Sequence, residues 1–194
     1  MAVKPGTDAS EKVNGSNDDD LLYGKAGNDT ILGFAQDDKL QGDSGNDQLF
    51  GGDGIDLLLG GSGNDLLNGG TGDDRLLGGT GADKLTAGDG NDVLDGGLGN
   101  DRLRGGEGAD VFVFTAEGNG RTGKDFIVDF KDNVDTLFID HNLGFTTAQQ
   151  VVNTAHSSGG DTPLDLSKTG DDNFQIILLG IDNGSQLLND IVIF

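Results

Sequence analysis

The sequence predicts an all-β fold: a long coil of short parallel strands, followed by a β-rich cap that contains one short helix. Three observations predict it. A nine-residue repeat keeps its register over residues 15–113, a large apolar residue occupies one place of every repeat, and aromatic and β-branched clusters replace the glycines after Val113. A fixed period of this kind indicates units that bury a core by stacking on their neighbours. The expected domains are a lead-in at 1–14, the coil at 15–113 and a capping region at 114–194.

The repeat is regular in three of its nine places. The sixth place is aspartate in all eleven units, the eighth is leucine, isoleucine or phenylalanine, and the first is glycine except at Ala87. A disordered acidic linker would share the composition, but it would not hold one apolar residue in phase. The units begin at residues 15, 24, 33, 42, 51, 60, 69, 78, 87, 96 and 105.

Each unit combines a six-residue turn with a three-residue strand. Glycines at the first, second and fourth places suit a tight turn that needs positive φ, and the strand points one side chain inward and two outward. Two units are expected to close one turn of the coil, so that units i and i+2 stack. Their aspartate carboxylates and backbone carbonyls then face a common gap of about 4.8 Å.

A gap lined by oxygen atoms is suited to a hard cation. Calcium accepts six to eight oxygens at about 2.3–2.6 Å in irregular geometry, whereas magnesium prefers a tighter octahedron. Calcium is therefore the expected cofactor, and eleven units contain nine i, i+2 pairs, which limits the inter-repeat sites to nine. Because the units at 15 and 33 lack glycine at the second and fourth places, the sites are expected mainly between Gly42 and Asp110.

The units resemble the Gly-Gly-x-Gly-x-Asp-x-(large apolar)-x nonapeptides of RTX calcium-binding proteins over residues 15–113. The resemblance implies a right-handed parallel β-roll in which the sixth-place aspartate supplies a carboxylate, turn carbonyls complete the shell, and loops i and i+2 share each ion. The metal-site residues that it implies are the glycines Gly42, Gly51, Gly60, Gly69, Gly78, Gly96 and Gly105 and the aspartates Asp29, Asp38, Asp47, Asp56, Asp65, Asp74, Asp83, Asp92, Asp101 and Asp110.

The region after Val113 resembles the cap that follows the repeats in serralysin-type proteases and alginate-epimerase R-modules. The matching stretches are "GADVFVF", "DFIVDFKDNVDTL", "GGDTPLDL" and "IILLGI…LLNDIVIF". Their aromatic and β-branched clusters predict strands, and "TTAQQVVNTAHSS" from Thr146 predicts the short helix. The final "DIVIF", an acidic residue followed by apolar ones, resembles the tail of a type I secretion signal, and a plain edge strand would have the same pattern.

The repeats are expected to fold only with calcium. One inward leucine per unit contributes roughly 2 kcal/mol, whereas ordering the backbone costs about 1–2 kcal/mol per residue. Residues 15–113 also hold 20 acidic against 6 basic side chains, which repel one another when the coil closes. Because a ligand bound only by the native state stabilises it, we expect a module that folds outside the cell. The resemblance to RTX proteins implies that it supports type I secretion. The expected location is secreted, extracellular or on the cell surface, and the expected partners are calcium and the type I secretion machinery.

Composition excludes several other classes of protein. A net charge of −22 disfavours nucleic acid as a partner, and no stretch of about 20 apolar residues predicts membrane insertion. The absence of cysteine excludes disulfides and thiolate metal sites, and His141 and His156 do not form a His-Glu-x-x-His zinc motif. The start "MAVKPGTDASEKVNG" has no apolar core of a cleaved signal peptide, which agrees with export by another route.

Two alternatives remain open. Lys84, Arg102 and Arg104 gather on one outward face and suit an anionic polysaccharide, as the resemblance to R-modules implies, or simply a solvated face that tempers local repulsion. No nucleophile and base pair stands out after the repeats, and the 14 residues before Gly15 are too few for a catalytic domain, so the chain is not expected to be an enzyme. It would alternatively be a fragment of a larger RTX enzyme.

Overall fold

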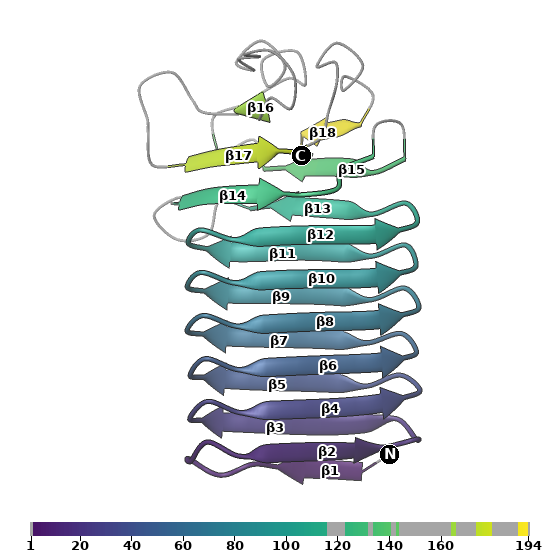
Figure 1. The fold of residues 1–194 in the computed structure, drawn as a ribbon, viewed down its shortest axis with the longest axis vertical. Helices are drawn as coiled ribbons and strands as arrows, with labels where there is room; N and C mark the ends of the chain where they lie inside the picture. Colours follow the sequence, from purple (N-terminus) through teal and green to yellow (C-terminus); the bar gives the residue numbers. More distant parts are fainter. Residues whose placement is uncertain are drawn as a thin grey trace.

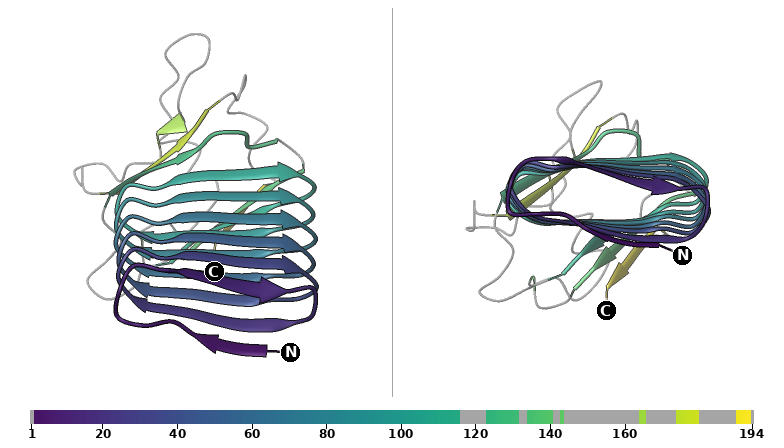
Figure 2. Two further views of the ribbon diagram at one scale, coloured as in Figure 1. Left: turned by 60° about the horizontal axis from the view of Figure 1, so that its bottom comes forward. Right: turned by 90° about the horizontal axis from the view of Figure 1, so that it is seen from below.

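The structure is a computed structural model, and it describes residues 2–115, 123–131, 134–140, 143, 164–165, 174–179 and 190–193. Within this part, two nine-stranded sheets face each other, and the chain passes from one to the other along the repeats (Figure 1). Seen along the axis, successive turns superpose as one flattened oval (Figure 2, right). The fold is the expected parallel β-roll.

The strands of the first sheet, sheet A, are the odd-numbered ones up to β15 and then β18. They are β1 (Ala2–Pro5), β3 (Asp20–Ala26), β5 (Lys39–Ser44), β7 (Leu57–Ser62), β9 (Arg75–Thr80), β11 (Val93–Leu98), β13 (Val111–Phe114), β15 (Thr136–Ile139) and β18 (Ile191–Ile193).

The strands of the second sheet, sheet B, are the even-numbered ones up to β16 and then β17. They are β2 (Lys12–Ser16), β4 (Thr30–Ala35), β6 (Gln48–Asp53), β8 (Leu66–Thr71), β10 (Lys84–Asp89), β12 (Arg102–Glu107), β14 (Gly123–Ile127), β16 (Leu164–Asp165) and β17 (Phe174–Leu178).

Up to β15, strands that are two apart in the sequence pair in parallel. Leu49 of β6 pairs with Leu67 of β8, and Leu67 pairs with Leu85 of β10, which is a constant step of 18 residues. The expectation that two nonapeptides close one turn is therefore confirmed. Because the step is constant, every sixth-place aspartate lies directly above the aspartate of the previous turn.

The core is a double file of eighth-place side chains, one from each strand. Leu22, Leu58 and Leu94 in sheet A, like Leu49 and Leu85 in sheet B, have no exposed surface. From β3 to β12 each strand adds one such residue, so the core stays thin there. After the repeats it widens, because β13 buries both Phe112 and Phe114. The thin core of the repeats limits how much of the stability can come from apolar packing.

The coil is longer than the eleven units. On its N-terminal side, β1 and β2 pair with β3 and β4, and Val13 is buried opposite Ile31. On its C-terminal side, Leu103 pairs with Ile127, a step of 24 residues instead of 18. Residues 6–14 and 123–128 thus align with the repeats, the second segment after six additional residues.

The region after the repeats is rich in strands, as predicted. β14 and β15 extend sheets B and A, and β17 and β18 pair with them in parallel. Phe112 and Phe130 pack with ring centroids 6.0 Å apart where the repeats end. The helix predicted from Thr146 lies outside the described residues. In the described part of the chain, no helix has the length and apolarity to cross a membrane.

Candidate metal centre: two aspartate ladders

The sixth-place aspartates lie in the turns and form one row along each edge of the roll. We call the turns from sheet A to sheet B the first edge and those from sheet B to sheet A the second edge. The first-edge row is Asp29, Asp47, Asp65, Asp83 and Asp101. The second-edge row is Asp20, Asp38, Asp56, Asp74, Asp92 and Asp110.

Hydrogen bonds between successive turns hold each row together. The backbone N–H of Asp47 donates to Oδ1 of Asp65, and the N–H of Asp65 donates to Oδ1 of Asp83, both at 2.8 Å. On the second edge, the N–H of Asp56 donates to Oδ1 of Asp74 at 2.8 Å. Each carboxylate is therefore fixed in place by the turn before it, and its other oxygen is left to face the gap.

That other oxygen, Oδ2, is buried and has no hydrogen-bond partner among the described residues. A buried carboxylate oxygen without a partner is costly, and it calls for a ligand that is not part of the chain. The aspartates concerned are Asp29, Asp38, Asp47, Asp56, Asp65, Asp74, Asp83, Asp92 and Asp110.

Oxygens of two turns converge at the first-place glycine. A Cβ built on Gly60 would lie 2.5 Å from both Oδ2 of Asp65 and the carbonyl oxygen of Gly78, and Gly78 stands in the same relation to Asp83 and Gly96. The fourth-place glycine allows this approach, because Gly63 has a φ of +124° that other residues rarely adopt. The turns thus provide space lined by carboxylate and carbonyl oxygen.

This donor set fits calcium. It consists of oxygen alone, it is negatively charged, and it repeats along both edges in an irregular arrangement that a hard, adaptable cation tolerates. The sixth-place aspartates and the first-place glycines named in the sequence are brought together, two turns at a time.

The rows also continue beyond the eleven units, which the sequence reasoning missed. The N–H of Glu11 donates to Oδ1 of Asp29 at 2.8 Å, so Glu11 takes the sixth place of an additional unit. At the other end, the N–H of Asp101 donates to Asp125 at 2.9 Å and that of Asp110 to Asp135 at 3.1 Å. The signal was present in "GRTGKDFIV" at 120–128, which has the repeat pattern displaced by six residues.

A second row of hydrogen bonds, from the fifth place, was also missed. The N–H of Asn64 donates to Oδ1 of Asn46, and the N–H of Ala82 donates to Oδ1 of Asn64, both at 2.7 Å. On the second edge, Asp37 and Asp73 accept in the same way. These bonds run opposite to the aspartate bonds, so each turn is tied to both neighbours. Asparagine or aspartate at the fifth place in eight of eleven units was the available signal.

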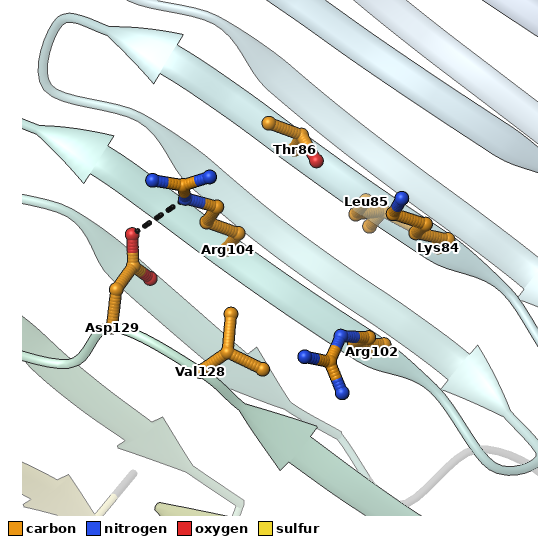
Figure 3. Close-up of a pocket in the computed structure, with 7 residues that line it drawn as sticks. All are labelled: Lys84, Leu85, Thr86, Arg102, Arg104, Val128 and Asp129. Carbon is orange, nitrogen blue, oxygen red and sulfur yellow. Dashed lines mark hydrogen bonds and ion pairs between the residues drawn. The ribbon is translucent and has the colours of Figure 1, made fainter. Parts of the chain in front are cut away.

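The three basic residues singled out in the sequence do lie together. Lys84 and Arg102 pair across β10 and β12, and with Arg104 they line a depression of about 390 Å³ on sheet B (Figure 3). Arg104 Nε lies 3.3 Å from Oδ2 of Asp129. In the described part of the chain, Lys84 and Arg102 make no ion pair, so two cationic groups are available to a ligand.

Comparison with protein families identifies the repeats. Residues 14–49, 50–85 and 77–112 match the model of the RTX calcium-binding nonapeptide repeat. The chain belongs to the RTX family. No curated protein matches the sequence.

Two solved structures illustrate the likeness. The solution structure of the AlgE6R3 subunit of the mannuronan C5-epimerase from Azotobacter vinelandii is 32% identical, with 68% of this chain and 78% of that chain covered and a TM-score of 0.47. The crystal structure of the extracellular lipase LipA from Serratia marcescens is 17% identical, with 96% of this chain and 39% of that chain covered. Its TM-score of 0.53 supports a shared fold alone.

Two RTX units lack glycine at both the second and the fourth place, and their turns differ. In the unit at 33, Phe34 and Gln36 adopt φ of +89° and +70°, so the turn is kept without glycine. In the unit at 15, the hydroxyl of Ser16 donates to Oδ2 of Asp20 at 2.8 Å. Asp20, which was not among the expected site residues, therefore has a partner from its own turn.

Burial raises the pKa of most ladder aspartates. Desolvation is the largest cause, and it lifts the pKa of Asp56 and Asp65 to about 6 and that of Asp74 and Asp83 to about 7. The N–H bond from the previous turn lowers the pKa and neighbouring carboxylates raise it. The ion-free roll therefore resists holding these groups as anions at neutral pH.

These shifts predict opposite effects of pH with and without calcium. In the unfolded chain the carboxyls lose their protons near the ordinary aspartate pKa of 3.8, but the ion-free roll keeps them up to about pH 6–7. Their contribution to the stability of the ion-free roll is therefore full below about pH 4 and is lost as pH rises to about 7. With calcium the order reverses, because protons compete with the metal for the carboxylates.

We expect sheet signal in far-UV circular dichroism at about pH 4.5 in a chelator, and much less at about pH 7.5. The calcium concentration that half-saturates the sites should be at least about tenfold higher near pH 5 than near pH 7.5. A half-saturating concentration that does not change over this range would contradict the role given to the buried carboxylates.

Proposed function

We propose that this chain is an RTX module that folds on binding calcium outside the cell. The observation that carries the proposal is the pair of buried carboxylate rows, in which the nine Oδ2 atoms named above have no partner among the described residues. Calcium, when bound, supplies the positive charge that these rows lack. The family, shown by the repeats, makes calcium the expected metal.

Three kinds of group in the chain would form each calcium site. Aspartates such as Asp65 and Asp74 hold charge in the gap, the N–H groups of the previous turn orient them, and glycines such as Gly60 leave room for the ion. The nine inter-repeat pairs remain the main sites. The continued rows add candidate pairs at Glu11 with Asp29 and at Asp110 with Asp135.

Calcium-dependent folding follows from mass action. Each ion bound only by the folded chain adds stability of RT ln(1 + [L]/Kd), and sites of extracellular modules have Kd values of about 10⁻⁴–10⁻³ M. At cytosolic calcium concentrations the repeats would stay unfolded, and at the millimolar calcium concentration outside the cell they would fold. Folding would thus depend on whether the chain is inside or outside the cell.

A calcium titration tests this proposal. Far-UV circular dichroism at about pH 7.5 should show little sheet in a chelator and a cooperative gain at roughly millimolar calcium, and magnesium at the same concentration should not replace it. Asp65→Asn, which keeps the Oδ1 acceptor and removes the charge, should raise the calcium midpoint several-fold. Asp8→Asn, at an exposed aspartate outside the rows, is the matched control. Equal sheet content in chelator and in calcium would refute the proposal.

We further propose that the segment at 190–194 supports export by a type I system. Its acidic residue and following apolar residues have the pattern described above, and its strand β18 pairs with β15 at the end of sheet A. The same segment would therefore serve as signal before folding and as edge strand afterwards.

Export can be measured in a bacterial host that carries a type I exporter. Deletion of 190–194 should remove most of the protein from the medium while the cells still contain it. Lys84→Ala, on the outer face of sheet B, should be exported like the unchanged chain. Undiminished export of the deletion variant would show that the segment is only a strand.

Binding of an anionic polysaccharide is a second candidate function. The depression on sheet B favours it, because Lys84 and Arg102 have no ion pair within the described residues and lie beside Arg104. We propose no catalytic role for the roll. In a larger RTX enzyme it would be the calcium-folded module beside a catalytic domain.

Alginate, a polyuronate, is a suitable probe. In saturating calcium, replacing Lys84, Arg102 and Arg104 by alanine should weaken binding to immobilised alginate about tenfold or more, with calcium folding unchanged. Lys39→Ala with Arg75→Ala, which removes two positive charges from sheet A, is the control and should bind normally. Equal loss in both variants would indicate that net charge alone determines binding.

A further inference from the structure

The two edges of the roll differ in the charge that surrounds their aspartate rows. The difference lies in the first five places of each unit, which precede the ladder aspartate. On the second edge, the six units from 15 to 105 carry seven acidic residues there and no basic one. On the first edge, the five units from 24 to 96 carry one acidic residue, Asp43, and one basic residue, Lys25. The second-edge residues are Asp18, Asp19, Asp37, Asp53, Asp73, Asp89 and Glu107, all of them exposed.

The fifth place shows the difference most clearly. Asn46 and Asn64 accept a backbone N–H from the next turn on the first edge, both at 2.7 Å. Asp37 and Asp73 accept the corresponding bond on the second edge, both at 2.8 Å. The hydrogen bond is the same in both cases, and only the charge differs. The fifth-place aspartates therefore add negative charge that the turn does not need for its structure.

The outer carboxylates act on the buried row of their own edge. Asp37 and Asp73 each accept the N–H of the next turn, so their charges lie where two turns of the second edge meet. On the first edge, the neutral Asn46 and Asn64 hold the corresponding places. The potential at the gaps is thus more negative along the second edge.

Counter-charges do not remove the difference. Among the described residues, Lys131 Nζ lies 3.3 Å from Oε2 of Glu107, which partly neutralises the C-terminal end of the second edge. Asp53 accepts only the neutral hydroxyl of Thr71, at 3.1 Å. The middle of the second edge therefore keeps its excess of negative charge.

We infer that the roll has two classes of calcium site, with the second edge binding calcium more tightly than the first. This inference rests on the proposed calcium binding at both rows and adds an order to it. At limiting calcium, second-edge turns close while first-edge gaps still exchange their ions. Fifth-place residues set the affinity without touching the buried carboxylates.

The experiment exchanges charge between the edges with little change of shape. Asp37→Asn with Asp73→Asn removes two charges from the second edge, and Asn46→Asp with Asn64→Asp adds two to the first. All four changes keep an Oδ1 acceptor for the N–H of the next turn. The variant with all four changes has the net charge of the unchanged chain. It therefore separates the effect of charge on one edge from the effect of total charge.

Calcium binding is measured by equilibrium dialysis, and loop amides of each edge, such as those of Asp65 and Asp74, are followed by NMR. We expect two affinity classes in the unchanged chain, with second-edge amides responding at lower calcium. The ratio of the first-edge to the second-edge dissociation constant should fall about two- to tenfold in each double variant and further in the combined variant. In about 1 M salt the ratio should approach one, because the screening length shrinks to about 3 Å.

The outcomes separate this inference from the proposal beneath it. If calcium binds and folds the chain, but both edges respond together and the ratio is the same in all variants, the inference is wrong and calcium-driven folding stands. If both double variants shift all sites uniformly, total charge and not edge charge determines affinity, which also overturns it. Absence of calcium binding would refute the proposed function itself.

Discussion

Every turn of this roll places one buried carboxylate directly above another, and their dehydration and mutual repulsion have to be offset before the strands can pair. One oxygen of each carboxylate is satisfied by an N–H of the previous turn, such as that of Asp65 for Asp83. The other faces the gap and the carbonyl of the next turn. The fold and the metal site are consequently one structure, since the residues that shape the turn are those that leave the oxygens unsatisfied.

The apolar core of the repeats is thin. One leucine or isoleucine per strand, as at Leu49 and Leu67, makes a file with no second layer behind it. Backbone hydrogen bonds between turns are numerous, but their net contribution is modest because the unfolded chain bonds to water. Under the proposed function, bound calcium would supply the remaining stabilisation, which is mainly electrostatic.

Much of the fold and of the metal site was predictable because the same residue type recurs at the same place of each nonapeptide. The 18-residue step, the inward leucines and the two rows of sixth-place aspartates followed from the period and from alternation in a strand. The turn at Phe34 and Gln36 was not predictable, since neighbouring turns impose a left-handed backbone that local preference disfavours. The ends of the coil were also missed, because Glu11 has one methylene more than aspartate and Asp125 follows an insertion, so a search for a fixed register passes over both. The opposite hydrogen bonds at the fifth and sixth places could not be deduced either, since the sequence does not show whether a side chain bonds to the turn before or the turn after.

The 18-residue step has a consequence for how such a chain can lengthen. Duplicating two neighbouring nonapeptides adds a complete turn and leaves the downstream segments over the same sheet. Duplicating one nonapeptide shifts everything downstream by half a turn. Asp73 would then lie on the first edge, among the fifth-place asparagines, and the surface around Arg102 would move to the opposite sheet. Growth of a roll with unlike edges is thus constrained to even numbers of units, and an ancestral odd duplication would leave a visible change of phase.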